Sequence, residues 1–279
     1  RPRRVAFARL SGYCRLLAGR SMSAEKFAFA FAVAVAVFAG GALGLIVQRV
    51  LHEKFTTGGP RDMIGAVVGL LTLLSALVLG LLIWTAYGVF AGQNVAIQTL
   101  AAKVLQLDLA LADYGPEAKD ARMHVRQDLG TTIDEIWGSN ESDADFIATN
   151  FAEAIHNLRN REGTLESLHP TTDAQTQALA AAKATTDAIG QSRLQMSFAL
   201  ASPVSYPLMI TVVGWAMLLF GGYGLMSRGN PMSVAIVAIG AVAVASAFYL
   251  ILDLSSPYSG IFRASPAPLE QVLAVMGKE

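Results

Sequence analysis

The sequence predicts an all-α, polytopic membrane protein with four transmembrane helices and a helical cytoplasmic insert between the second and the third. Hydrophobic residues make up 53% of the 279 residues and charged residues only 15%, against roughly 25% charged in soluble domains. Mean hydropathy is +0.46. Four uncharged stretches are each long enough to cross a hydrocarbon layer of about 30 Å, which takes roughly 20 helical residues.

The four predicted spans are residues 27–47, 63–90, 206–226 and 231–252. In the last of them, Asn230 is an expected N-cap, with Pro231 at the favoured first helical position. The predicted segments are a basic tail (1–26), spans one and two (27–91), an acidic insert (92–205), spans three and four (206–253) and a C-terminal motif with a short helix (254–279).

The first span has an alternative reading as a secretory signal peptide, because it joins a basic leader to an apolar core and small residues at 39–42. The apolar run continues to Val47, which favours a retained anchor. Residue 1 is Arg, and Met22 is a conventional start, so residues 1–20 read as an upstream extension or an interfacial tail.

Basic residues predict the orientation in a bacterial inner membrane. Residues 1–26 carry seven Lys or Arg, and the two predicted hairpin loops carry four. Because short cytoplasmic flanks are enriched in Lys and Arg, we expect both termini in the cytoplasm. The even number of spans then places the insert on the same side.

The insert contains 15 acidic residues and 8 Lys or Arg. Past Phe90, apolar residues keep a 3,4 spacing that is typical of a coiled-coil seam and predicts one rod of about 75 Å from Met63 to Asp113, ending at Gly115-Pro116. The seam residues are Ile97, Leu100, Val104, Leu107, Leu111 and Tyr114.

Three further helices are predicted in the insert, over residues 116–137, from about Asp143, and over 172–200. The second has the apolar residues Ile147, Phe151, Ile155 and Leu158 on one face. The last repeats the 3,4 spacing, with Arg193 at one seam position, and is expected to lie antiparallel to the extension of span two. Its other seam residues are Leu179, Ala182, Thr186, Ile189, Met196 and Leu200.

No pattern of a catalytic, cofactor or metal site occurs in the sequence. Cys14 is the only cysteine, and the four histidines lack metal-ligand spacing. The acidic group Glu141, Asp143 and Asp145 lacks the spacing of a calcium loop. Lys plus Arg and Asp plus Glu both number 21, so the overall charge does not indicate nucleic acid. We therefore expect no enzyme, no cofactor and no nucleic-acid partner.

Small and hydroxyl-bearing residues recur along span two, at Gly65, Gly69, Thr72, Ser75 and Ala76. Such residues let helix backbones approach closely. Packing against span one, a subunit interface and a pore lining all fit this pattern. The hydroxyl groups are equally able to bond to their own helix.

The C-terminal motif begins at Asp253, where span four ends, and includes Pro257, Tyr258 and Gly260. We expect Asp253 to cap the following turn or to pair with Arg263, with gating or ion attraction as the alternative role. The short helix after Pro266 has one apolar side and is expected to lie along the membrane interface.

Four phrases of the chain resemble a family of bacterial membrane proteins that is catalogued as a domain of unknown function and often labelled bestrophin-like. They are residues 75–82, 109–119, 133–137 and 250–261. In the last phrase the family commonly has Asp-Arg-Pro-Phe where this chain has Ser-Ser-Pro-Tyr at 255–258. The resemblance implies kinship with oligomeric anion channels.

The expected function is therefore an oligomeric ion channel of the inner membrane. The alternative is a non-conducting scaffold or sensor whose cytoplasmic helices recruit a partner protein. The expected partners are the lipid bilayer, further copies of the chain and a cytoplasmic protein.

Overall fold

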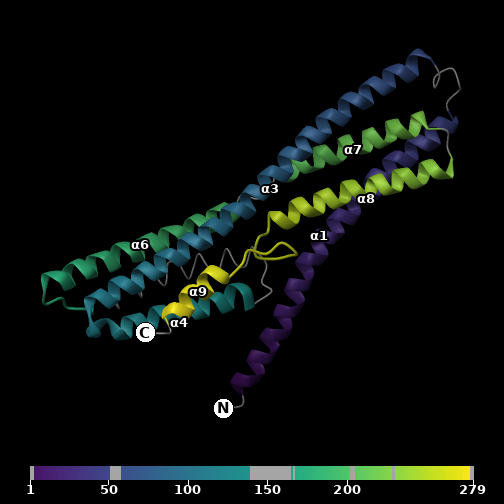
Figure 1. Cartoon of the computed structure of the whole chain (residues 1–279). Coiled ribbons are helices and arrows are strands. Elements are labelled where there is room, and N and C mark those ends of the chain that lie inside the picture. Colours follow the sequence, from purple (N-terminus) through teal and green to yellow (C-terminus); the bar gives the residue numbers. More distant parts are fainter. Residues whose placement is uncertain are drawn as a thin grey trace. The chain divides into compact units, whose positions relative to one another are not determined.

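The computed structural model describes residues 3–50, 58–138, 165, 167–201, 205–227 and 230–276, with side chains in the first helix described from residue 24 onwards (Figure 1). All regular structure in these ranges is helical, which confirms the predicted fold class. The helix expected from Asp143, its apolar face and the acidic group at 141–145 lie outside the described residues.

The chain divides into two compact units. The membrane unit comprises residues 23–88 and 204–255, and the insert unit comprises 1–22, 89–203 and 256–279. Four helices have the length and apolar character of membrane spans: α1 (Arg3–Val50, from Ala24), α3 (Gly59–Tyr114, from Arg61), α7 (Tyr206–Met226) and α8 (Pro231–Leu254). They confirm the four predicted spans. Asn230 is the N-cap residue of α8, although its side chain makes no capping hydrogen bond.

Within the membrane unit, α1 runs antiparallel to α8. The rings of Phe27 and Tyr249 lie 4.8 Å apart at one end, and Gly41 packs against Val237 near the other. At Gly240 the same helix α8 contacts the ring of Phe220 on α7. Helix α8 therefore packs against both α1 and α7.

Glycines bring α1 and α7 into backbone contact, with the two helices parallel. A Cβ atom on Gly40 would lie 2.6 Å from the carbonyl oxygen of Met217, and one on Gly44 would overlap the carbonyl oxygen of Gly221. Small residues permit such close approach. The close glycine contact of span one is thus with span three, whereas the sequence suggested span two.

The first part of α3 lies antiparallel to α7. Gly222 packs against Val68, and the Met226 methyl group would lie 3.4 Å from a Cβ on Gly65. Successive spans therefore alternate in direction, so that residues 24, 88, 206 and 254 lie at the same end of the membrane unit.

Helix α3 as a whole has 56 residues and a length of about 84 Å, and the insert unit is built on its second part. Its predicted seam is buried from Ile97 to Tyr114, and so is the predicted seam of α6 (Asp173–Ala201) apart from Arg193. Gly115, with φ of +118°, ends α3 as predicted and leads through a 3₁₀ turn (Pro116–Ala118) into α4 (Lys119–Gly138).

The last helix of the insert unit is α9 (Ala267–Met276). Its apolar residues Leu269, Val272 and Met276 are buried in the same core as the α4 residues Ile133 and Ile136. Protein thus covers the apolar side that the sequence predicts to face the membrane interface.

Candidate functional site

Asp253 forms a buried ion pair with Lys26 in the membrane unit. The Lys26 Nζ and Asp253 Oδ1 atoms lie 3.5 Å apart, and the side chains are 8% and 0% exposed. This distance exceeds the 2.7–2.9 Å of a strong charge-assisted hydrogen bond, so the main effect is that each charge compensates the other in a dry environment. The pair ties the start of the membrane-spanning part of α1 to the end of α8.

The sequence predicts that Asp253 caps the following turn or pairs with Arg263. The Arg263 Nε atom donates instead to the backbone carbonyl oxygen of Tyr258, at 3.1 Å. Sequence reasoning assigned Lys26 to the basic tail and missed its role, because 227 positions separate it from Asp253 and no local pattern links them.

The rest of the motif belongs to the insert unit, where Tyr258 is 3% exposed and Gln93 is 1% exposed. The Tyr258 hydroxyl donates to Gln93 Oε1 at 2.8 Å. The Gln93 Nε2 atom donates to the carbonyl oxygen of Met196 at 3.1 Å. A buried chain of hydrogen bonds thus joins the C-terminal motif to α3 and α6.

Backbone and aromatic contacts close the motif into a loop. Gly260 has φ of +115°, a conformation that L side chains rarely adopt, and the Ala264 amide donates to the Pro257 carbonyl oxygen at 2.8 Å. The Trp137 Nε1 atom donates to the Ala264 carbonyl oxygen at 2.8 Å, and the Trp137 ring meets the Tyr258 ring edge-on at 6.1 Å. Pro257 is fully buried. Pro257, Tyr258 and Gly260 of the motif are therefore held in place within the insert unit.

Charged side chains hold the insert helices to one another. Asp108 on α3 accepts two hydrogen bonds from the Arg122 guanidinium on α4, at 2.8 and 2.9 Å. On α6, the Arg193 guanidinium donates to the Thr132 hydroxyl of α4 at 3.2 Å. That bond explains how an arginine is accommodated at a seam position.

A model of the Bestrophin-like domain family matches residues 29–269. The chain belongs to the bestrophin-like family. No curated protein and no solved structure matches the chain. The matched range includes all four candidate spans of this bestrophin-like chain almost completely, together with Asp253, Pro257, Tyr258 and Gly260. The family and the four apolar helices together identify a polytopic membrane protein.

Span two of the bestrophin-like chain carries the other predicted site residues. A Cβ on Gly69 would meet no atom of another helix within 4 Å, and Ala76 is exposed. The Thr72 hydroxyl donates to the Val68 carbonyl oxygen at 2.8 Å and lies 3.4 Å from the Tyr223 hydroxyl. The Ser75 hydroxyl oxygen is buried without a hydrogen-bond partner. None of these five residues lines the pocket to which Met63, Val67 and Leu71 of the same helix contribute.

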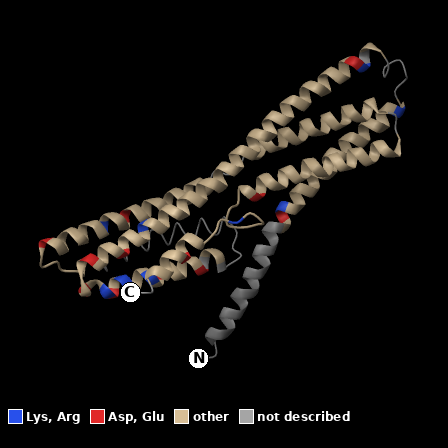
Figure 2. Ribbon diagram, viewed as in Figure 1, with Lys and Arg blue, Asp and Glu red and all other residues tan. Residues whose placement is uncertain are grey.

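The apolar stretches of the four spans lack charged residues, which lie beyond them or at their ends (Figure 2). In the described ranges, no three His, Cys, Asp or Glu side chains come together as they would around a metal ion. Between the ends of the spans, the described side chains of the membrane unit are therefore apolar or hydroxyl-bearing.

Proposed function

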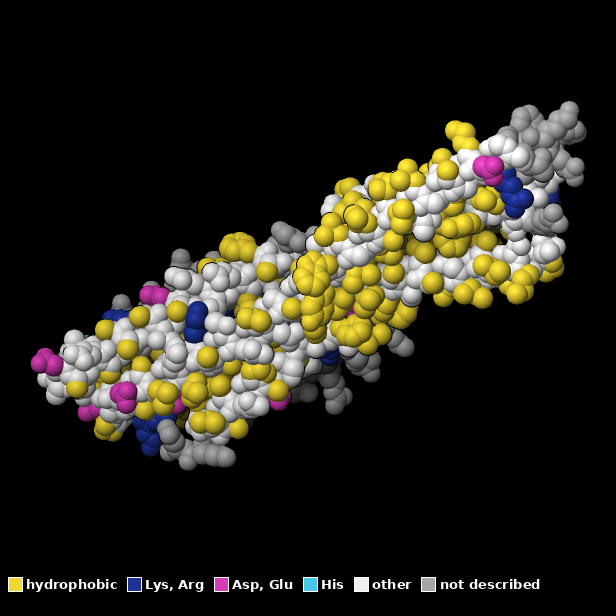
Figure 3. All heavy atoms as spheres, turned by 45° about the horizontal axis from the view of Figure 1, so that its top comes forward, with side chains coloured by type: hydrophobic (Ala, Val, Ile, Leu, Met, Phe, Trp, Pro, Cys, Tyr) yellow, Lys and Arg dark blue, Asp and Glu magenta, His cyan; other side chains and the backbone are white. Residues whose placement is uncertain are grey.

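We propose that the protein is an oligomeric ion channel of the bacterial inner membrane, in which copies of the chain meet through α3. The observation that carries this proposal is the uneven burial of the spans. Within the chain, 11% of the apolar window of α3 is buried, against 28–33% for the other three spans. Figure 3 shows hydrophobic side chains spread over the visible face of the membrane unit.

A stripe of small residues on α3 is suited to contact with another helix, being exposed at Gly69, Ala76 and Gly80 and bordering α7 at Gly65 and Thr72. At 100° per residue, Gly65, Gly69, Thr72, Ala76 and Gly80 lie within about 80° of one another around the helix. Lipid is as apolar as leucine, so spans associate through close packing at small residues rather than through a hydrophobic drive. Copies arranged about an axis through this stripe would place Thr72 near that axis.

The proposed conduction path lacks charged side chains, because none occurs between Asp62 and Lys103. Hydroxyl groups and backbone would line it. The family label supports the proposal through kinship with anion channels, an argument by association rather than by geometry. The proposal keeps both termini and the acidic insert in the cytoplasm, and it includes no enzymatic activity, cofactor or nucleic-acid partner.

The test is ion flux from liposomes that contain the purified protein, combined with the mass of the particle in detergent. Thr72→Val removes the hydroxyl at nearly constant size and should lower the flux several-fold. Thr85→Val is the matched control, since its hydroxyl bonds to the Leu82 carbonyl oxygen and lies about 160° around α3 from Gly69. A monomeric mass, or electrically silent vesicles at high protein density, would overturn the proposal.

The alternative function is a non-conducting scaffold or sensor. It is favoured by the insert unit, whose own hydrophobic core would let it present a defined surface to a cytoplasmic protein. Silent vesicles combined with specific capture of a cytoplasmic protein by the insert side would support this alternative.

A further inference from the structure

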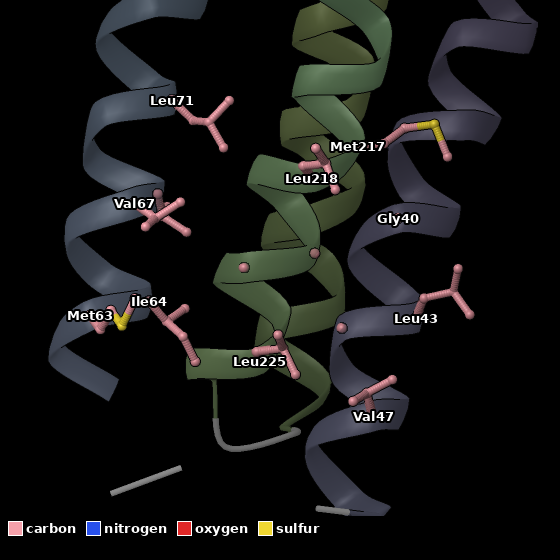
Figure 4. Close-up of a pocket in the computed structure, with 14 residues that line it drawn as sticks. Gly40, Leu43, Val47, Met63, Ile64, Val67, Leu71, Met217, Leu218 and Leu225 are labelled. Carbon is pink, nitrogen blue, oxygen red and sulfur yellow. The ribbon is translucent and has the colours of Figure 1, made fainter. Parts of the chain in front are cut away.

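The membrane unit contains an apolar groove of about 710 Å³ between α3 on one side and α1 and α7 on the other (Figure 4). Glycine, leucine, valine, isoleucine and methionine supply every lining residue. In Figure 4, Ile64, Val67 and Leu71 point from α3 toward α7. A polar ligand would find no side-chain partner in this groove.

We propose that one acyl chain of a membrane phospholipid occupies this groove. The α3 lining runs from Met63 to Leu71, about 12 Å along the helix, which is less than half of a hydrocarbon layer of about 30 Å. The α1 and α7 lining residues also lie toward the loop ends of their spans. The groove therefore lies in one leaflet, at the depth of the acyl chains.

The volume of the groove fits this occupant. A cavity of about 150 Å³ accepts benzene, so 710 Å³ has room for a long hydrocarbon chain. Two turns of a second helix, about 11 Å in length and diameter, would need about 1,000 Å³. The glycines that would admit such a helix closely are already engaged, Gly40 by Met217 and Gly44 by Gly221.

Two cationic side chains lie close in sequence to the lining residues at the loop end of the groove. Arg49 follows Val47 by two positions, Arg61 precedes Met63 by two, and both are exposed. Asp62 is beside Arg61, so these three residues together carry a net charge of +1. A phosphate group at the interface is the headgroup chemistry that this arrangement favours.

This inference does not depend on ion conduction, because lipid occupancy is measured directly. The protein is reconstituted in phosphatidylcholine vesicles with a minor fraction of phosphatidylglycerol that carries a photoreactive diazirine on one acyl chain. After illumination, peptide mapping should find label concentrated on the groove residues of α1, α3 and α7. Labelling no higher there than on the outward-facing Leu73 and Leu77 of α3 would overturn the proposal.

A matched pair of variants tests whether the groove itself holds the chain. Leu71→Trp fills the groove and should lower its labelling about fivefold, which corresponds to roughly 1 kcal/mol or the loss of about five to ten carbon contacts. Leu70→Trp, at a neighbouring position that is 59% exposed and outside the lining, should leave the labelling unchanged. Equal labelling of both variants would contradict the proposal.

The remaining arms concern the headgroup and a rival occupant. Replacing both Arg49 and Arg61 by Gln should reduce labelling by the phospholipid probe, and unchanged labelling would remove the phosphate from the proposal. If the wild-type groove stays unlabelled and Leu71→Trp alters the mass of the particle, a second copy of the chain occupies the groove and the proposal fails.

Discussion

Replacing Asp253 by asparagine should destabilise the membrane unit by about 3 kcal/mol. The pair of Lys26 and Asp253 is nearly inaccessible, at 8% and 0% exposure, so the substitution leaves an ammonium group buried without its counter-charge. Removal of one partner from a buried ion pair costs about 3–5 kcal/mol. We take the lower figure because the 3.5 Å separation is long and a lysine side chain can extend toward the interface.

The assay is equilibrium unfolding in mixed micelles, followed by the fluorescence of Trp84 and Trp215 in the membrane unit. Glu25→Gln is the matched control, because it makes the same change of acid to amide at an exposed position and should stay within about 0.5 kcal/mol of wild type. The double variant Lys26→Met with Asp253→Leu should recover much of the loss, since two apolar groups replace two buried charges. The reasoning is refuted if Asp253→Asn matches Glu25→Gln, or if the double variant is less stable than Asp253→Asn.

Three further substitutions test contacts inside the insert unit and inside the membrane unit. Tyr258→Phe should lower the free energy of unfolding of the insert unit by about 1–3 kcal/mol, measured by thermal unfolding. The reason is that the Gln93 Oε1 atom loses the hydrogen bond that the Tyr258 hydroxyl donates to it. Arg122→Lys should cost about 2 kcal/mol in the same assay, since lysine cannot reproduce the two-pronged contact with Asp108. Gly44→Ala should lower the unfolding temperature of the membrane unit, because the added methyl group meets the backbone of α7.

Each of these has a control of the same chemistry. Tyr206→Phe changes a tyrosine that is 58% exposed, and Arg126→Lys changes an exposed arginine of α4, so both should be nearly neutral. Gly69→Ala adds its methyl group to open space and should be neutral or slightly stabilising for the single chain. Should Gly69→Ala instead reduce the mass of the particle in detergent, α3 would be implicated in assembly. If a test variant is as stable as its control, the contact that the substitution removes does not stabilise the protein as described.

Features of the fold that depend on local pattern could be predicted from the sequence. The seam from Ile97 to Tyr114 fixes both the length of α3 and the face that it buries, because apolar spacing of three and four residues allows only one helical register. Gly115 followed by Pro116 predicts the end of that helix, and in the structure Gly115 has a positive φ there. Uncharged length alone located the four spans.

Features that depend on distant partners could not be predicted. Lys26 reads as one more basic residue of a tail, and Gln93 as a polar residue beyond the end of a span. Their roles exist only because the C-terminal segment supplies Asp253 and Tyr258. The choice of α7 as the partner of α1 was equally hidden, since glycine stripes occur on several spans and a stripe does not specify its partner.

The contacts of α1 with α7 and α8 also constrain the order of events during synthesis. Lys26 is 227 positions ahead of Asp253, and at 5–20 residues per second the ribosome needs about 10–45 s to supply that partner. Until then α1 lacks the contact of Lys26 with Asp253, and its glycines lack α7 until residues 217–221 have been made. Completion of the membrane unit must therefore follow translation of the last third of the chain, so that truncated products would contain an inserted but unfinished bundle.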